Sequence, residues 1–248
     1  MKYFGIKTDF IQHVLKLVNS RSYRHSKKTC VVTGTKLVKD LGKRLHFHDV
    51  LCSSPDHPDL QGLQFDELRL AAPRVLKRVA RLEDFDGLIA TCPLPEKTSW
   101  KDLQRPQLIL CLEYVEDAGL MGTLLRTALA FEWQAVYFMK YCADPFDNRC
   151  IRSSQGALFD LPYIKGDFED LRKFCHQKRL LLTTPHIRGE KLTNLDLCDK
   201  QGQHQGVALF LREEYLTPFA PPKEILKVQV PDPWENHPNP PGEAFDFR

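Results

Sequence analysis

The stretch Leu-Ile-Leu-Cys-Leu-Glu-Tyr-Val (108–115) decides the fold, because it reads as a buried strand and leads into a turn with two glycines, Gly119 and Gly122. Residues 124–131 then have the composition of a helix, and an apolar run follows at 135–139. A strand, a glycine turn, a helix and a second strand predict a right-handed βαβ unit and therefore a parallel sheet. Ligands of such sheets bind beyond the carboxyl ends of the strands. We expect a site at that edge, with Arg126 on the first turns of the adjacent helix.

The composition favours a globular protein with a polyanionic partner. The chain has 248 residues, enough for one large or two ordinary domains, and 42% of them are hydrophobic. No apolar run approaches the ~20 residues that span a bilayer, so we do not expect a membrane protein. The net charge is only +3, yet residues 1–50 contain eleven Lys or Arg and three Asp or Glu. This basic end predicts a polyanionic partner, and the alternative is a solvated helix face.

The eight cysteines are scattered without a CxxC pair. Their irregular spacing predicts neither a metal site nor the disulfide framework of a secreted protein. The opening Met-Lys-Tyr-Phe (1–4) is not followed by the apolar segment of a signal peptide. We therefore expect an intracellular, reducing compartment, which a mitochondrion, a chloroplast or the cytoplasm would provide.

Hydrophobic periodicity divides the chain into two α/β parts. Residues 1–95 are expected to form a small domain with its own core, followed by a proline-containing linker at 96–106. Its predicted elements are helices at 8–19, 35–41 and 65–79, a polar, basic stretch at 20–28, and strands at 30–34, 45–51 and 88–91. The second domain, 107–231, is expected to contain strands at 107–115, 134–139, 179–184 and 206–211, helices at 119–132, 148–155 and 168–177, and an extended piece at 228–231. The proline-rich tail, 232–248, is expected to be irregular.

An ordered set of motifs resembles a known family. Asp-Ala-Gly-Leu-Met-Gly-Thr-Leu-Leu-Arg-Thr-Ala (117–128) is similar to the first motif of the SpoU, or TrmH-like, branch of the SPOUT methyltransferases. Asp-Pro-Phe (144–146), Arg-Ser-Ser-Gln-Gly-Ala (152–157) and Leu-Pro (161–162) resemble its next block. Residues 1–95 resemble the small, ribosomal-protein-like RNA-binding module of the family, and plant or organellar-type members are the most similar. The resemblance implies an α/β fold with a SPOUT-type parallel sheet. In this family the C-terminal segment completes an α/β knot, so the knot is incomplete here if that segment does not thread it.

The resemblance also implies an activity and a set of functional residues. Members of the family transfer a methyl group from S-adenosylmethionine to a ribose 2′-hydroxyl of rRNA or tRNA, and they pair as homodimers or heterodimers through the catalytic domain. Arg126 matches the arginine to which the family assigns activation of the hydroxyl, where a guanidinium stabilises the developing oxyanion. Gly122 is expected to let the backbone approach the substrate, and Gly156 either does so or packs a helix on a strand. The residues expected to contact cofactor or substrate are Gly122, Ser154, Gly156, Leu211, Glu214 and Val230, and those expected to face RNA are Lys16, Arg21, Arg24, Lys27 and Lys28.

Three departures from the family pattern leave a second function open. Ala118 and Leu120 replace the proline and asparagine of the first motif, and residues 212–216 lack the glycines of the cofactor loop. The closing segment begins at Val230 and then enters the proline-rich tail. The alternative is a methyltransferase-like RNA-binding protein or pseudoenzyme that acts as a scaffold, or with a partner subunit, in ribosome assembly. An unrelated α/β hydrolase is disfavoured, because the sequence has no nucleophile elbow or triad.

Overall fold

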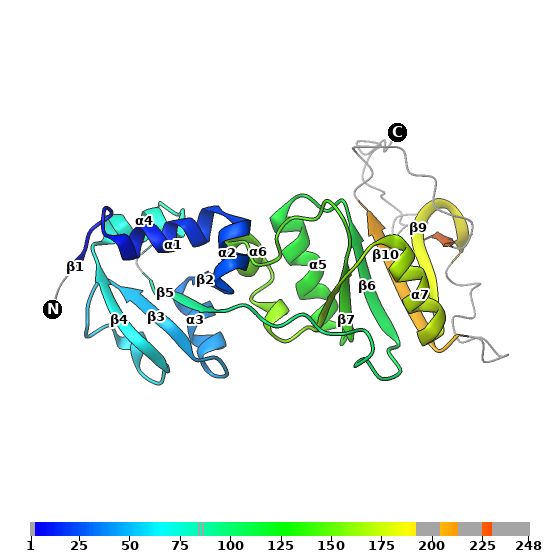
Figure 1. The fold of residues 1–248 in the computed structure, drawn as a ribbon, viewed down its shortest axis with the longest axis horizontal. Coiled ribbons are helices and arrows are strands. Elements are labelled where there is room, and N and C mark those ends of the chain that lie inside the picture. Colours follow the sequence, from blue (N-terminus) through cyan, green and yellow to red (C-terminus); the bar gives the residue numbers. More distant parts are fainter. Residues whose placement is uncertain (1–2, 84, 86, 192–203, 213–224, 230–248) are drawn as a thin grey trace, which may run out of the picture.

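The computed structural model describes residues 3–83, 85, 87–191, 204–212 and 225–229, which form two α/β halves arranged along the long axis (Figure 1). Among these residues, no helix is both long and apolar enough to cross a membrane. The helices are α1 (Asp9–Asn19), α2 (Arg21–Lys27), α3 (Thr35–Gly42), α4 (Pro73–Ala80), α5 (Ala118–Ala130), α6 (Asn148–Ser153) and α7 (Phe168–Lys178), with short 3-10 turns η1 (Pro58–Leu60) and η2 (Ala157–Phe159). The strands are β1 (Tyr3–Phe4), β2 (Thr29–Thr33), β3 (Phe47–Cys52), β4 (Phe65–Ala71), β5 (Ile89–Pro93), β6 (Leu108–Glu113), β7 (Ala135–Phe138), β8 (Tyr163–Lys165), β9 (Leu180–Lys191), β10 (Gly206–Arg212) and β11 (Leu226–Gln229).

The first half is built on a mixed sheet with the strand order β1-β4-β3-β5-β2. Successive side chains of a strand point to opposite faces, so Val31 packs under α1 and α4 while its neighbours Cys30 and Val32 face α3. The face under α1 and α4 has its own apolar cluster, including Ile11 and Leu76. This face gives the first half the separate core that its sequence predicts.

Two segments of the first half differ from the predicted elements. A helix over 65–79 is wrong for residues 65–71, which form β4 and pair in parallel with β3 from Phe47–Phe65 to Cys52–Leu70. The helix begins only at Pro73, whose missing N–H is tolerated in a first turn. The basic stretch at 20–28 contains helix α2, which the side chain of Ser20 caps by accepting from the Tyr23 amide. Pairing with a neighbouring strand therefore overrides local helical spacing in β4.

The second half is an all-parallel sheet with the order β11-β9-β10-β6-β7-β8. Strands β6 and β7 pair in parallel and α5 connects them, so the βαβ unit that the sequence predicts is confirmed. In Figure 1, α5 covers the face of the sheet toward the first half and α7 covers the opposite face. The carboxyl ends of β6, β7, β8 and β10 consequently meet at one edge, where the site is expected.

The two halves share an apolar core in addition to their separate ones. One cluster of buried side chains runs from α3 and β2 of the first half to α5, α6 and η2 of the second. Gly156 lies at this junction with a positive φ of 74°, and a Cβ on it would come within 3.0 Å of the Leu41 side chain. The expectation of an independent core for residues 1–95 therefore holds for only one face of the first sheet.

A buried ion pair joins the halves beside this shared core. The Arg24 side chain of α2 is only 3% exposed, and its Nε and Nη2 lie 2.9 Å and 2.8 Å from Asp144 Oδ2 in the second half. Its Nη1 donates to the carbonyl oxygens of Leu17 and Val18 at 2.7 Å and 3.0 Å. His25 Nε2 lies 3.2 Å from the other carboxylate oxygen. The prediction that Arg24 faces RNA is wrong, because every donor group of this guanidinium is used inside the protein.

We predict that Arg24→Met lowers the free energy of unfolding by about 3–5 kcal/mol, because it leaves the Asp144 carboxylate buried without its arginine partner, bound only by His25 and the Phe146 amide among the described residues. Urea denaturation measures this change. Lys27→Met, one turn further along α2 at an exposed position, is the matched control and should change stability by about 0.5 kcal/mol or less. Equal losses for the two variants would contradict the role of Arg24.

Candidate active site

The carboxyl edge of the second sheet is shaped by the ends of β6 and β10. β6 ends at Glu113, and Tyr114 then turns the chain with a positive φ of 55°. Asp117 begins α5, because its Oδ1 accepts from the Leu120 amide at 2.7 Å. Arg212, the last residue of β10, is the direct register partner of Glu113. The ends of β6 and β10 and the start of α5 therefore lie together at this edge of the sheet.

A charged pair and two stacked tyrosines line this point. Arg212 Nη1 donates to Glu113 Oε2 at 3.0 Å, and the side chains of the pair are only 13% and 15% exposed. The Arg212 guanidinium also lies 4.2 Å from the ring centre of Tyr114, which stacks on Tyr141 at 4.5 Å. Tyr141 is 60% exposed, so the edge presents an aromatic face to solvent beside a partly buried cation and carboxylate.

Arg126 lies further along α5 than the sequence suggests. It is the ninth residue of the helix, about 12 Å along the axis from Ala118 at ~1.5 Å per residue. The expected position on the first turns is therefore wrong, and the side chain is exposed on the surface of the helix. It is also the one charged residue of α5, on a face whose other exposed side chains include Leu120 and Thr127.

Gly122, Ser154 and Gly156 come together, but the structure uses them for packing. A Cβ on Gly122 would lie 1.9 Å from the Ser153 hydroxyl and 2.7 Å from the Cys150 carbonyl oxygen, so this glycine lets α5 approach α6. Ser154 is buried, and its hydroxyl donates to the Ile151 carbonyl at 3.2 Å. Gly122 therefore allows two helices to touch, and the expected approach of its backbone to a substrate is not seen. Gly156 likewise allows a close contact with Leu41 of α3.

The other predicted cofactor residues lie on or beyond β10. Leu211 is half-buried on this strand and packs against the shared core. Glu214 and Val230 lie outside the described residues. Of the predicted cofactor site, the structure therefore describes Leu211 and, beside it, Arg212 and the paired segment of β6.

The residues predicted to face RNA fall into three environments. Lys16 and Lys27 are exposed, and their Nζ atoms lie 5.9 Å and 5.8 Å from the ring centre of Tyr23. Lys28 is exposed at the end of α2. Arg21 lines a cavity between the halves, and Arg24 is buried in the ion pair described above. Arg21 is itself exposed, so Arg24 alone of the predicted set is not a surface cation.

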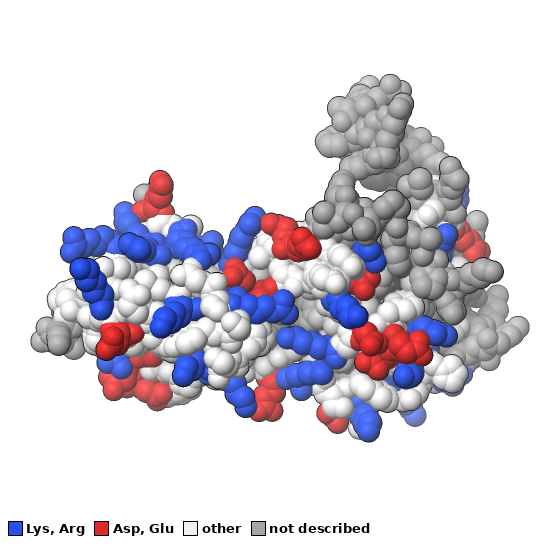
Figure 2. All heavy atoms as spheres, turned by 45° about the horizontal axis from the view of Figure 1, so that its top comes forward, with Lys and Arg blue, Asp and Glu red and all other residues white. Residues whose placement is uncertain are grey.

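The sequence analysis missed a second basic surface on α4. Arg74, Lys77, Arg78 and Arg81 recur at helical spacing, are all exposed, and line an open hollow. α4 packs beside α1, and Arg81 bonds to Asn19 at the end of that helix. Figure 2 shows Lys and Arg side chains gathered over this side of the first half. The helical spacing of these four cations is visible in the sequence, but they lie beyond the basic segment 1–50 from which the RNA-facing residues were predicted.

The thiols near the site do not provide a nucleophile. Cys142 donates to the Leu112 carbonyl at 3.3 Å, and burial raises the pKa of its thiol. Burial likewise raises the pKa of Cys150 to about 12. Both sulfurs stay protonated near neutral pH, whereas the thiolate is the reactive form. In the part of the chain that the structure describes, no group of three or more His, Cys, Asp or Glu side chains could hold a metal ion.

Comparison with known proteins identifies the edge as part of a family domain. Residues 107–215 match the model of the SpoU rRNA Methylase family. The chain is 30% identical over 174 residues to "rRNA methyltransferase 3A, mitochondrial" of Danio rerio, covering 66% of this chain and 40% of that protein. It is 32% identical over 87 residues to the 23S rRNA (guanosine(2553)-2′-O)-methyltransferase RlmP of Bacillus subtilis, covering 35% of this chain and 34% of that protein. The chain thus spans less than half of either curated relative.

The fold has solved counterparts. The AdoMet-bound rRNA methyltransferase from Sinorhizobium meliloti superposes with a TM-score of 0.74 at 16% identity, over 100% of this chain and 92% of that one. This similarity shows the fold: a SPOUT-type parallel sheet preceded by a smaller α/β half.

We predict that Gly122→Ala destabilises the protein by about 1–3 kcal/mol, because the new methyl group collides with the Cys150 carbonyl and the Ser154 amide, which are backbone atoms that cannot move aside. The better helix propensity of alanine, worth ~1 kcal/mol, opposes this loss. Thermal or urea unfolding measures it. Thr127→Ala, exposed on the same helix, should leave stability nearly unchanged. A Gly122→Ala variant as stable as the parent would show that α5 and α6 are not in this contact.

Proposed function

We propose that the chain transfers a methyl group from S-adenosylmethionine to a ribose 2′-hydroxyl of rRNA or tRNA, because residues 107–215 match the model of the SpoU rRNA Methylase family. The family match carries this proposal, since it contains the carboxyl edge of the sheet and all of α5. The first half would deliver the RNA, and the second half would perform the reaction.

The described residues of the edge suit the proposed methyl donor. S-adenosylmethionine contains an adenine ring and an amino-acid group with one carboxylate and one ammonium. Tyr141 offers an exposed aromatic face for a ring, and the Arg212–Glu113 pair offers one charge of each sign. Leu211, which precedes Arg212 on β10, adds half-buried apolar surface. These residues would hold the donor, which supplies an electrophilic methyl group when bound.

Arg126 is the proposed activating residue. A ribose hydroxyl is a poor nucleophile, and a guanidinium beside it stabilises the oxygen as its proton leaves. Arg126 is exposed, so another surface must enclose it before water is excluded. We propose that a second copy of the chain covers α5, because Leu120 is 42% exposed and Phe131, directly after the helix, is 70% exposed.

The proposed RNA-binding surface combines α1, α2 and α4. Lys16 of α1, Lys27 of α2 and Lys28 directly after it are exposed, as are the four cations on and directly after α4. Phosphate contacts from such cations supply most of the sequence-independent affinity for RNA. Arg152 lies where α4 meets the second half, because its Nη1 donates to the Ala80 carbonyl at 3.2 Å. It would place a cation between the RNA surface and the reaction edge.

A reducing compartment is proposed for the protein. The seven described cysteines are all buried and unpaired as thiols. The Danio rerio relative is named as mitochondrial, which makes the mitochondrion the compartment to test first.

The second candidate function is an RNA-binding protein of this fold that does not methylate. The Arg212–Glu113 pair favours it, because a bulky, already paired side chain stands where the family has a glycine-rich loop. Such a protein would act as a scaffold, or with a partner subunit, in ribosome assembly. Transfer of methyl groups separates the two functions directly.

We predict that the purified chain transfers labelled methyl from S-adenosylmethionine to rRNA or tRNA, and that Arg126→Ala lowers kcat by about 10²–10³ with little change in RNA affinity. The label should map to a ribose 2′-oxygen by protection of the adjacent phosphodiester from alkaline cleavage. Arg172→Ala, an exposed arginine of α7, is the matched control and should keep full turnover.

We expect Arg78→Gln on α4 to affect RNA binding and not turnover, the reverse of Arg126→Ala. It should weaken RNA binding and spare kcat at saturating RNA, because it removes a phosphate contact and no reacting group. Unchanged turnover in Arg126→Ala would refute the role of Arg126, and the absence of transfer to any RNA would favour the scaffold.

We also predict a dimer whose dissociation constant rises about tenfold or more in Leu120→Asp. An acidic residue in the first turn of a helix is favourable for the helix itself, so the loss reports on the α5 surface. Sedimentation velocity measures it. Leu82→Asp, at a 39% exposed leucine of the first half, is the control and should keep the parent dimer. A monomeric parent, or equal dimerisation in Leu120→Asp, would contradict the proposed interface.

A further inference from the structure

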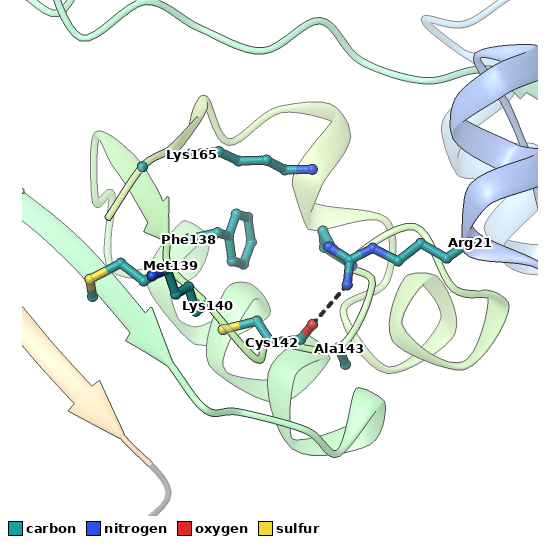
Figure 3. Close-up of a pocket in the computed structure, with 9 residues that line it drawn as sticks. Arg21, Phe138, Met139, Lys140, Cys142, Ala143 and Lys165 are labelled. Carbon is teal, nitrogen blue, oxygen red and sulfur yellow. Dashed lines mark hydrogen bonds between the residues drawn. The ribbon is translucent and has the colours of Figure 1, made fainter. Parts of the chain in front are cut away.

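A cavity of about 160 Å³ lies between the two halves, outside the β6–β10 part of the edge. The last residues of the neighbouring strands β7 and β8, and residues that follow them, form one side of it, and Arg21 of α2 reaches in from the first half (Figure 3). The volume is several times the ~30 Å³ of one water molecule in the liquid. Its lining residues are Arg21, Phe138, Met139, Lys140, Cys142, Ala143, Pro145, Lys165 and Gly166.

The charged residues that line the cavity are all cations. Arg21, Lys140 and Lys165 line it, and Figure 3 shows the Arg21 and Lys165 side chains pointing toward one another across it. Among the described residues, none of these three cations forms an ion pair with a carboxylate. The nearest acid that acts on Lys165 is Asp144, which Arg24 and His25 already bind.

Burial makes this arrangement costly without a counterion. Lys165 is half-buried, and desolvation lowers its pKa; the Asp144 carboxylate raises this pKa, and Arg21 and Lys97 lower it again by repulsion. Partly buried charges are normally paired, because the protein interior solvates them poorly. An anion between Lys165 and Arg21 would replace repulsion with charge-assisted hydrogen bonds.

The donors left in the cavity suit a tetrahedral oxyanion. Arg21 Nη1 donates one hydrogen bond to the Cys142 carbonyl at 3.1 Å, which fixes the guanidinium and leaves its other N–H groups available. The Lys165 ammonium adds three donors from the opposite side, near the ring of Tyr163 at 5.5 Å. A guanidinium and an ammonium on opposite walls match the several oxygens of a phosphate better than they match a single carbonyl.

We propose that this cavity is a seat for one phosphate group of the RNA backbone, held between Arg21 of the first half and Lys165 of the second. The identity of the ligand as RNA rests on the proposed function, whereas the phosphate seat rests on the cavity alone. The seat would bind only when both halves are correctly placed, so it links the RNA-delivering half to the half that carries the reaction.

The first arm of the test uses inorganic phosphate against the full chain. Phosphate added at constant ionic strength, with chloride as the replaced anion, should raise the Tm of the parent. Lys165→Gln and Arg21→Gln should each weaken phosphate binding about tenfold or more, as expected for loss of a hydrogen bond to a charged group. Lys173→Gln, an exposed lysine of α7, should keep the parent response. Should Arg21→Gln fold poorly, Lys165→Gln alone decides this arm.

The second arm measures RNA binding as a function of salt. Loss of one phosphate contact should reduce the slope of log K against log[salt] by about 0.7–0.9 in the Arg21→Gln and Lys165→Gln variants and not in Lys173→Gln. Effects in both arms support an RNA phosphate in the seat. A phosphate effect with an unchanged RNA slope overturns RNA as the occupant and assigns the seat to a free phosphate. No effect in either arm overturns the seat itself.

Neither arm uses methyl transfer, so the two proposals fail separately. A chain that binds phosphate and RNA through Arg21 and Lys165 but transfers no methyl group retains the seat and loses the proposed activity. A chain that methylates RNA while both variants bind like the parent retains the activity and loses the seat.

Discussion

The ion pair between Arg24 and Asp144 is the interaction on which the rest of the structure depends. A buried guanidinium and carboxylate cannot separate without leaving an unpaired charge, so they fix α2 against the loop before α6. That placement brings Arg21 to the ends of β7 and β8 and presses Leu41 against Gly156. The ion pair and the shared core thus hold the two sheets together, with the proposed RNA-binding cations on one half and the proposed reaction edge on the other.

The sequence predicted most of the second half because its signals are local. Buried parallel strands read as short apolar runs, and the glycine turn before α5 marks the βαβ unit. It failed at 65–71, where pairing with β3 decides the conformation and no residue of the segment reveals it. It also misplaced Arg24, since a lone arginine in a basic stretch looks the same whether its partner is solvent or a carboxylate 120 positions away.

The candidate site shows why motifs locate a region better than they assign roles. Gly122, Ser154 and Gly156 were predicted together and lie together, but Gly122 packs α5 against α6, the Ser154 hydroxyl bonds to Ile151 of α6, and Gly156 packs against Leu41 of α3. The Arg212–Glu113–Tyr114 cluster was not predicted, because it depends on the register between β10 and β6. Arg126 retains its proposed role for a different reason: it is the one charge on a helix face that is otherwise uncharged and exposed.

The central claim is that the edge beside Arg212 and Tyr141 binds the methyl donor. Titration calorimetry of the full chain with S-adenosylmethionine tests it most directly, with S-adenosylhomocysteine as a ligand that lacks the transferable methyl. The account predicts saturable heat for both ligands with one site per chain. A flat response to both, from protein that still binds RNA tightly and with strong salt dependence, would contradict it and identify the chain as an RNA-binding scaffold.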